Sequence, residues 1–172
     1  MEKGKFIIID GNSLMHRAFY ALPNLTNSKG FHTSVIYGFI NMINKIKEEY
    51  KPQYIGIAFD TKAPTFRHQE YAGYKAGRLK MAEEMAEQIP VLKEVLTAMN
   101  IRQVEIDGFE ADDIIGTVAA RCDEEGIPAF IVTGDKDAFQ LISDNVHTLM
   151  TKKGISEIEE YDTAKLHEKY GI

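Results

Sequence analysis

The sequence contains a single cysteine, Cys122, no tryptophan and only five prolines among its 172 residues. One cysteine excludes an internal disulfide and any zinc cluster built from cysteines. The longest apolar runs, such as residues 6–9, fall far short of the ~20 residues that a membrane-spanning helix needs. No charged and then apolar leader opens the chain. We therefore expect a soluble, cytoplasmic protein without a membrane partner.

The length and composition of the chain are typical of one globular domain, which would span residues 1–172. Hydrophobic residues make up 44% of the sequence and charged residues 27%, a composition that excludes a disordered chain. Short apolar runs alternate with longer segments of helical period, which predicts an α/β fold with a mainly parallel sheet. We expect three layers, with helices on both faces of the central sheet.

The apolar pattern also predicts the individual elements. Strands are expected at residues 6–9, 54–59, 101–106, 129–133, 146–150 and 157–161. Helices are expected at residues 13–22, 34–49, 82–99, 110–125 and 138–142, with a last one that Asp162 caps and Gly171 ends. Ser34 is expected to cap the second helix, and Pro90 to interrupt or bend the third.

The charge is unevenly distributed along the chain. The net charge of −6 argues against a protein that binds nucleic acid over its whole surface. Residues 61–81, the basic segment, carry five basic side chains and one acid, a net charge of +4 that leaves −10 elsewhere. Pro64, Gly73 and Gly77 lie within it and predict flexibility. Such a segment suits a protein that holds phosphates in one place and metals in another, although a solvated loop would have the same charge.

Acidic side chains stand at the ends of the predicted strands. Asp10, Asp60 and Asp135 follow three of them, and Glu110 and Asp112 open the helix after a fourth. Because the carboxyl ends of parallel strands meet at one edge of a sheet, we expect these acids and their neighbours to cluster. The predicted cluster contains Asp10, Asp60, Glu110, Asp112, Asp113, Asp135 and Asp137.

A cluster of this kind requires cations or protons. Two carboxylates ~4 Å apart repel by about 4 kcal/mol at an effective dielectric constant near 20. Oxygen ligands without histidine or cysteine favour Mg²⁺ or Mn²⁺ over zinc. Seven acids exceed the needs of one ion and indicate two metal ions ~3.5–4 Å apart, the arrangement that cleaves phosphodiester bonds. Taken singly, each acid is also explained by helix capping or turn chemistry.

The sequence lacks the residues that several other kinds of catalytic site require. A phosphatase with an aspartyl nucleophile requires a second acid two residues after Asp10, where Asn12 stands. No glycine-rich loop with Lys-Ser or Lys-Thr follows a strand, which excludes a P-loop. The histidines form no Ser/His/Asp set and are expected to be surface or core residues: His16, His32, His68, His147 and His167.

The basic segment begins directly after the second acid of the cluster. Arg67, Lys75 and Arg78 are candidate catalytic residues that would hold the scissile phosphate and stabilise charge in the transition state. Tyr71 and Tyr74 lie between them, either as stacking platforms for unpaired bases or as packed side chains. The candidate nucleic-acid contacts are Arg17, Lys62, Arg67, Tyr71, Tyr74, Lys75, Arg78 and Lys80.

These motifs resemble the 5′ nuclease domains at the N-terminus of bacterial DNA polymerase I, which belong to the flap endonuclease family with its PIN-like, resolvase-like fold. The matching segments are IDGNS (9–13) with Arg17, AFD (58–60), the run 66–78, FEADD (109–113) and TGDKD (133–137). The resemblance extends from residue 6 to about residue 170. It implies a structure-specific 5′-3′ exonuclease and 5′-flap endonuclease that acts in DNA replication and repair.

The resemblance also implies cofactors and partners. The seven acids would bind two Mg²⁺ ions, with Mn²⁺ as a plausible substitute, and the basic segment would form a helical arch around a single strand. The substrates would be DNA with a 5′ flap or a 5′ end at a duplex junction, and RNA–DNA primers. A monomeric domain covalently joined to a polymerase domain is implied.

One part of the family pattern is missing. In the family, a helix-hairpin-helix region follows the domain and supplies further aspartates for the second metal site. No such region follows Tyr170-Gly171-Ile172. We therefore expect an incomplete second metal site, and weak or no cleavage by this fragment alone.

Two alternative functions stay open. A PIN-type ribonuclease shares the acidic pocket, although a compact ribonuclease of that fold would not need the basic segment. A non-catalytic nucleic-acid-binding module is the other alternative, although such a module has no use for seven clustered carboxylates that face phosphate.

Overall fold

The structure is a computed structural model that describes residues 3–154 and 156–172. At its centre, six strands form one sheet in the order β3-β2-β1-β4-β5-β6. The parallel strands are β1 (Phe6–Asp10), β2 (Tyr54–Ala58), β3 (Arg102–Val104), β4 (Ala129–Thr133) and β5 (Val146–Thr151). The last strand, β6 (Ile158–Tyr161), pairs with β5 in the antiparallel direction. The predicted mainly parallel sheet is therefore confirmed.

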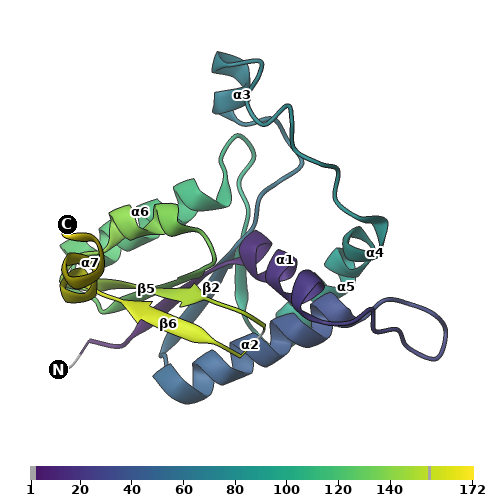
Figure 1. Ribbon diagram of the computed structural model, residues 1–172, viewed down its shortest axis with the longest axis horizontal. Helices are drawn as coiled ribbons and strands as arrows, with labels where there is room; N and C mark the ends of the chain where they lie inside the picture. The colour runs from purple at the N-terminus through teal and green to yellow at the C-terminus, as the bar shows by residue number, and fades with distance from the viewer. Residues whose placement is uncertain (1–2, 155) are drawn as a thin grey trace.

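Helices cover both faces of this sheet (Figure 1). One face carries α1 (Gly11–Ala21), α2 (Ser34–Tyr50) and α5 (Gln88–Ala98), and the other carries α6 (Ala111–Glu124), η1 (Lys136–Leu141) and α7 (Thr163–Tyr170). Alternate side chains of β1 serve the two layers, since Ile7 and Ile9 pack beneath α1 and α2 while Ile8 packs against α6. The buried Cys122 lies in the α6 layer. The predicted three-layer α/β architecture is confirmed.

The start of α2 is stabilised from a distance. Ser34, predicted as its cap, is the first helical residue, and Thr33 at the cap position makes no capping hydrogen bond with its side chain. The fully buried Gln88 accepts a hydrogen bond from the Val35 amide at 2.8 Å and donates one to the Glu84 carbonyl at 2.7 Å. The expected capping residue was wrong because the partner of these backbone groups lies far away in the sequence.

The helix predicted over residues 82–99 is interrupted, but not at Pro90. It consists of α4 (Glu83–Ala86) and α5, separated at Glu87. Proline has no N–H to donate to the carbonyl one turn earlier, at Ala86, and its ring crowds that carbonyl. Pro90 itself lies in the first turn of α5, where the missing N–H costs little. The break therefore falls one turn before the proline.

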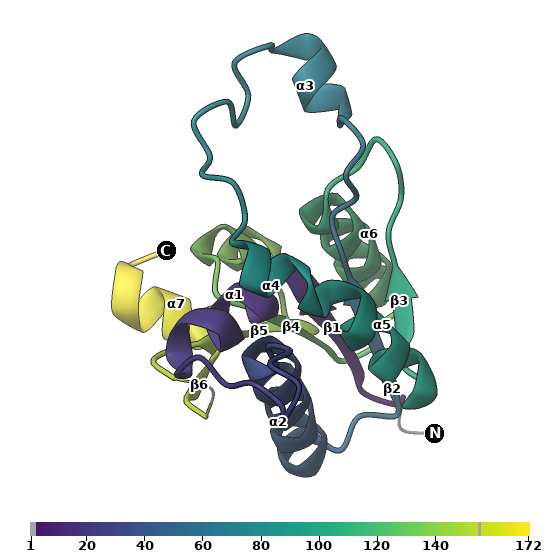
Figure 2. The same ribbon diagram turned by 90° about the vertical axis from the view of Figure 1, so that its right-hand side faces the viewer.

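Between β2 and α4 the chain leaves the sheet and carries a short helix, α3 (Phe66–Glu70), at its crest (Figures 1 and 2). One limb rises beside α6 and the other returns to α4 (Figure 2). The hydroxyl of Thr65 lies 2.8 Å from Nδ1 of His68 at the start of α3. Pro64, Gly73 and Gly77 did not predict α3, whereas the family resemblance implied helical structure in this segment. The flexibility expected of the basic segment stays a prediction.

Within the described residues, no helix is both long and apolar enough to cross a membrane.

The two helices α1 and α2 approach closely at Gly38. A Cβ atom on Gly38 would lie 2.8 Å from the Cβ of Ala18 and 3.0 Å from Cδ1 of Leu22. By contrast, a Cβ atom on Gly116, within α6, would lie 3.8 Å from Cδ2 of Leu141, an ordinary contact. The same glycine-to-alanine substitution therefore has opposite consequences in the two helices.

We expect Gly38→Ala to lower the free energy of unfolding by about 1–3 kcal/mol, because α1 and α2 must move apart. Gly116→Ala is expected to raise it by up to about 1 kcal/mol, because alanine is the better helix former and fits without displacement. Urea denaturation of both variants measures the two changes. Equal stabilisation by both substitutions would contradict the close packing at Gly38.

Candidate active site

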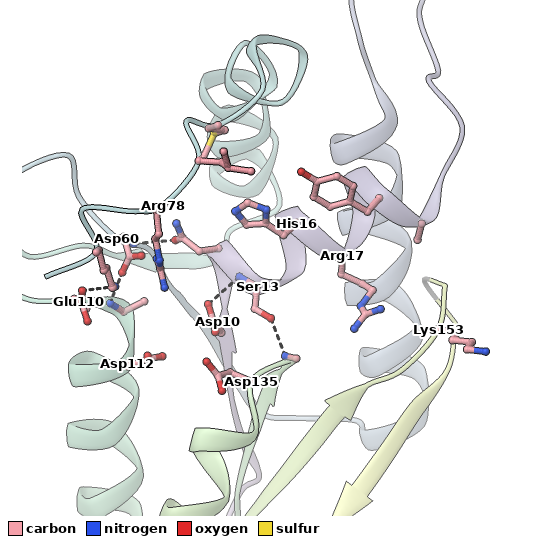
Figure 3. Close-up of a pocket in the computed structure, with 18 of the residues that line it drawn as sticks. Asp10, Ser13, His16, Arg17, Asp60, Arg78, Glu110, Asp112, Asp135 and Lys153 are labelled. Carbon is pink, nitrogen blue, oxygen red and sulfur yellow. Dashed lines mark hydrogen bonds and ion pairs between the residues drawn. The ribbon is translucent and has the colours of Figure 1, made fainter. Parts of the chain in front are cut away.

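Five of the seven predicted acids line one cleft at the carboxyl edge of the sheet (Figure 3). Asp10 ends β1, Asp60 follows β2, and Asp135 follows β4, while Glu110 and Asp112 lie at the start of α6. The cleft has a volume of about 1020 Å³. The strands β2, β1 and β4 are neighbours in the sheet, so their ends bring the three aspartates together. The predicted clustering is confirmed for these five residues.

The other two predicted acids lie beside the cleft. Asp137 lines a smaller cavity of about 260 Å³, which Asp112 and Asp135 also line. Asp113 is not among the residues of the main cleft. Its carboxylate instead receives two hydrogen bonds from the guanidinium of Arg67, at 2.8 and 2.7 Å. The cleft and its side cavity therefore share one wall, formed by Glu110, Asp112 and Asp135.

Asp10 is the most enclosed of the aspartates in the cleft, with 7% of its surface exposed. Its Oδ1 accepts a hydrogen bond from the Ser13 amide at 3.0 Å, and its Oδ2 accepts one from the Thr133 hydroxyl at 2.9 Å. Burial raises the pKa of Asp10, and the charges of Asp60 and Asp135 raise it further, against the effect of the two hydrogen bonds. A charged Asp10 is therefore costly unless a cation approaches.

Neighbouring polar residues fix the strand ends around the cleft. The side chain of Asn12 accepts a hydrogen bond from the Asp60 amide at 2.9 Å, and the Ser13 hydroxyl accepts one from the Gly134 amide at 2.7 Å. Asp60 in turn accepts a hydrogen bond from the Ala111 amide at 2.7 Å, at the start of α6. Asn12 and Ser13 were not among the predicted site residues. Their position directly after Asp10 is the signal that would have identified them.

Asp112 has the most strongly perturbed carboxylate of the cleft. It remains accessible to solvent, yet its pKa is raised to about 6. The largest cause is the partial loss of water around the carboxylate, and the negative charges of Asp10, Asp135, Asp60 and Glu110 add to it. Part of the repulsion predicted for the cluster is therefore relieved by proton uptake once the pH falls to about 6. A cation bound in the cleft would relieve it without a proton.

Glu110 is in the opposite situation, because cations surround it. Lys75 donates a hydrogen bond to Oε1 of Glu110, and the Tyr74 hydroxyl donates one to Oε2 at 3.0 Å. Nη1 of Arg67 lies 3.4 Å from Oε2. Burial raises the pKa of Glu110, but the contacts with Lys75, Tyr74 and Arg67 together outweigh burial and hold the pKa below its usual value. Arg67 lowers the pKa of Asp113 in the same way. These two acids are therefore already compensated by the basic segment.

Lys75 reaches Glu110 from an unusual backbone conformation. Its φ of 57° lies in the left-handed region, which is unfavourable for a residue with a Cβ atom. The turn made by this conformation brings Lys75 to its ion pair with Glu110. That ion pair offsets the energetic cost of the backbone conformation.

The predicted nucleic-acid contacts divide into two groups. Arg17, Lys75 and Arg78 line the cleft, and Arg17 also donates a hydrogen bond to the Thr151 carbonyl at 3.3 Å. The remaining candidates lie along the basic segment: Lys62 lines a cavity of about 320 Å³ below it, Arg67 pairs with Asp113, and Tyr71 and Lys80 are exposed.

The two tyrosines of the segment have different environments. The Tyr74 ring packs edge-on against His68 with its hydroxyl bonded to Glu110, as the packing alternative predicted. Tyr71 is 69% exposed, as a stacking platform requires.

The wall of the cleft opposite the acids contains residues that the sequence analysis did not select. His16, one of the histidines expected to be surface or core residues, is exposed and lines this wall, and its ring stacks on that of Tyr20 with centroids 6.3 Å apart. Lys153 reaches the wall from the turn between β5 and β6 (Figure 3). The Lys-Lys-Gly sequence of that turn would have indicated a basic contact. The cleft thus has an acidic side and a side that is aromatic and basic.

The donor chemistry of the cleft fits a divalent cation. Its acidic wall offers five carboxylates, two of which belong to aspartates with raised pKa values. Among residues 3–154 and 156–172, however, no three acidic, histidine or cysteine side chains lie close enough together to form a metal site as they stand. Side chains of the cleft must therefore turn inward if they are to ligate an ion together.

Comparison with known sequences identifies the class of the protein. The family model described as "5′-3′ exonuclease, N-terminal resolvase-like domain" matches residues 5–171. The chain belongs to this family, and the predicted resolvase-like fold is confirmed.

Proteins with similar sequences include bacterial DNA polymerases. The chain is 49% identical over 170 residues to DNA polymerase I of Geobacillus stearothermophilus, and 43% identical over 171 residues to that of Bacillus subtilis. It is 44% identical over 172 residues to the Mycobacterium tuberculosis enzyme. Each alignment covers 99% of this chain and 19% of the relative. The chain therefore spans about a fifth of the length of these relatives.

Solved structures share the fold. The T5 D15 protein co-crystallised with metal ions matches 98% of this chain and 61% of its own, with a TM-score of 0.73 and 18% identity. The catalytic core of Rad2 in complex with a DNA substrate matches 99% of this chain and 51% of its own, with a TM-score of 0.54 and 16% identity. At these identities the likeness shows a common fold.

The raised pKa of Asp112 makes stability depend on pH. The folded pKa of about 6 exceeds the unfolded value of ~3.9, so the folded protein loses stability as the pH rises between the two values. In EDTA at pH 8, Asp112→Asn is expected to raise the free energy of unfolding by about 1 kcal/mol, after allowance for solvent screening. At pH 3 the gain should vanish, since Asp112 is then neutral in both states.

Urea denaturation at the two pH values measures this difference, with Asp144→Asn as the control at an exposed acid outside the cleft. A gain from Asp112→Asn that is the same at both pH values would contradict the assignment.

Proposed function

We propose that the chain is a metal-dependent 5′ nuclease domain that hydrolyses phosphodiester bonds in DNA with a 5′ flap or a 5′ end at a duplex junction. The observation that carries this proposal is the cleft in which five carboxylates lie below a basic segment. Membership of a 5′-3′ exonuclease domain family supports the same reaction. Two solved T5 structures are consistent with it, a 5′-exonuclease with bound zinc and a D15 flap endonuclease variant in complex with DNA and metal ions.

The residues of the cleft would divide the chemistry. Asp10, Asp60, Glu110, Asp112 and Asp135 would hold divalent cations, Mg²⁺ or Mn²⁺, which supply an activated water and neutralise charge on the scissile phosphate. The raised pKa values of Asp10 and Asp112 favour this role, because a bound cation removes the cost of their charges. Asp137, in the side cavity, is a candidate for a second ion.

The basic segment would hold the nucleic acid. Lys75 and Arg78 line the cleft and would contact the scissile phosphate, where their charges stabilise the transition state. Tyr71 would stack on an unpaired base, and Arg17, Lys62 and Lys80 would contact phosphates along the strand. A single strand that passes under the segment would place its phosphate beside the carboxylates.

The relatives support a wider role. Since the chain matches a fifth of DNA polymerase I, we propose that it acts together with a polymerase and removes RNA primers and damaged 5′ ends. A PIN-type ribonuclease and a non-catalytic binding module are the alternatives, and cleavage assays separate all three. A ribonuclease would cut single-stranded RNA and leave flap DNA intact, and a binding module would cut neither.

The direct test is cleavage of an end-labelled 5′-flap DNA. We expect weak metal-dependent cutting near the flap junction that Asp135→Ala reduces further, by at least ~100-fold, because a ligand of the catalytic ions is lost. Binding of the flap DNA, measured by fluorescence anisotropy in Ca²⁺, should persist in this variant.

Asp144→Ala, which removes an exposed acid outside the cleft, is the matched control and should cut at the rate of the unchanged protein. Cutting by Asp135→Ala at that same rate would contradict a catalytic cleft.

Metal binding can be measured without any substrate. Mg²⁺ or Mn²⁺ should raise the melting midpoint of the protein, since an ion present at a hundred times its Kd stabilises the fold by about 2.7 kcal/mol. Asp10→Asn should remove most of this shift, whereas Asp144→Asn should retain it. A shift that survives Asp10→Asn in full would place the metal elsewhere.

A further inference from the structure

The first limb of the basic segment is fastened to the junction between β3 and α6. The guanidinium of Arg67 donates two hydrogen bonds to Asp113, from Nη1 to Oδ2 at 2.8 Å and from Nη2 to Oδ1 at 2.7 Å. Both oxygens of this carboxylate are therefore occupied by one planar group. Such a bidentate pair fixes orientation as well as distance.

Further contacts reinforce this attachment. The Phe66 amide donates a hydrogen bond to the Gly108 carbonyl at 3.1 Å, and the rings of Phe66 and Phe109 pack with centroids 6.0 Å apart. The guanidinium of Arg67 lies 4.5 Å from the centroid of the Phe66 ring. Arg67 is thus held between an aromatic ring and Asp113. Together these contacts fix the orientation of α3 relative to the start of α6.

Asp113 is itself fixed by the backbone and turned away from the cleft. Its Oδ2 accepts a hydrogen bond from the Glu110 amide at 2.9 Å, across the first turn of α6. Successive side chains of an α-helix point about 100° apart, so Asp112 and Asp113 face different directions. Asp112 lines the cleft with Asp10 and Asp135, and Asp113 does not. A metal ion could use Asp113 only after displacing Arg67.

We propose that Asp113 is a positioning residue that anchors the basic segment through Arg67, and that it is not a metal ligand. The inference rests on the proposed function, because the segment matters for catalysis only if it must stand over the cleft. Asp113 holds Arg67, Arg67 holds α3, and the turn after α3 then brings Tyr74 and Lys75 onto Glu110. Loss of the anchor should free this limb and weaken capture of the substrate while metal binding stays intact.

Proteolysis measures the anchor directly in the 172-residue chain. Chymotrypsin cuts after aromatic and leucine residues, and Tyr71 and Leu79 of the basic segment are 69% and 97% exposed. We expect Asp113→Asn and Arg67→Gln each to accelerate cutting after Tyr71 or Tyr74 by roughly tenfold, since the limb opens more often without the charged hydrogen bonds.

The double variant should be cut no faster than either single variant, because the two side chains act as one pair. Arg67→Lys, which keeps the charge but not the bidentate geometry, should fall between them and the unchanged protein. Arg121→Gln is the matched control, since Arg121 forms exposed ion pairs within α6, with Glu124 and Glu125. It should not change the rate of cutting.

Calorimetric titration with Mn²⁺ alone distinguishes an anchor from a ligand. Asp113→Asn should bind Mn²⁺ within about threefold of the unchanged protein, whereas Asp112→Asn should bind it at least ~10-fold more weakly. In cleavage of flap DNA, Asp113→Asn should raise KM by roughly tenfold with kcat within about threefold, the pattern of lost substrate binding.

The outcomes separate the possible roles. Loss of Mn²⁺ binding in Asp113→Asn, to the extent seen in Asp112→Asn, would make Asp113 a metal ligand and overturn the proposal. Unchanged proteolysis in both single variants would show that the ion pair anchors nothing. If Asp135→Ala cut flap DNA as fast as the unchanged protein, the proposed function would fail, while proteolysis and Mn²⁺ titration would still decide the role of Asp113.

Discussion

Repulsion among carboxylates at the end of a parallel sheet is the constraint on which the site depends. The order β2-β1-β4 brings Asp60, Asp10 and Asp135 to neighbouring strand ends, and α6 adds Glu110 and Asp112. The fold compensates for this charge in two ways. Hydrogen bonds from backbone and hydroxyl groups hold Asp10, and cations of the basic segment hold Glu110 and Asp113. The repulsion that remains appears in the raised pKa values of Asp10 and Asp112.

Some acids of the site are paired with cations and others are not, so the charge of the cleft differs from one side to the other. The side nearest the basic segment is neutralised by Arg67 and Lys75, while Asp10 at the end of β1 and Asp112 at the start of α6 have no basic partner among the described residues and keep raised pKa values. A cation entering the cleft is therefore attracted toward the sheet rather than toward the segment. A phosphate follows the opposite preference, toward Lys75, Arg78 and Arg17. The two kinds of charge are thus separated within one cavity.

Much of this arrangement could be predicted from the sequence because it depends on local rules. Strand periodicity gave the sheet, and the rule for parallel strand ends gave the meeting of Asp10, Asp60 and Asp135. The roles of Gln88 and Asn12 were not predictable in this way, because their partners lie 53 and 48 residues away. Asp113 was grouped with the cleft acids because spacing alone does not show that it turns toward Arg67. Long-range hydrogen bonds and side-chain direction are what the sequence pattern did not contain.

The buried position of Cys122 also has a practical consequence for fluorescence labelling. Its side chain is 5% exposed, and burial raises the pKa of the thiol, so little reactive thiolate is present at neutral pH. Because the sequence has no second cysteine, one introduced at Tyr71 would be the only reactive thiol on the protein. A maleimide dye there would report the environment and mobility of the basic segment at a single, defined position. The native cysteine need not be removed, so the packing of α6 against the sheet stays unaltered.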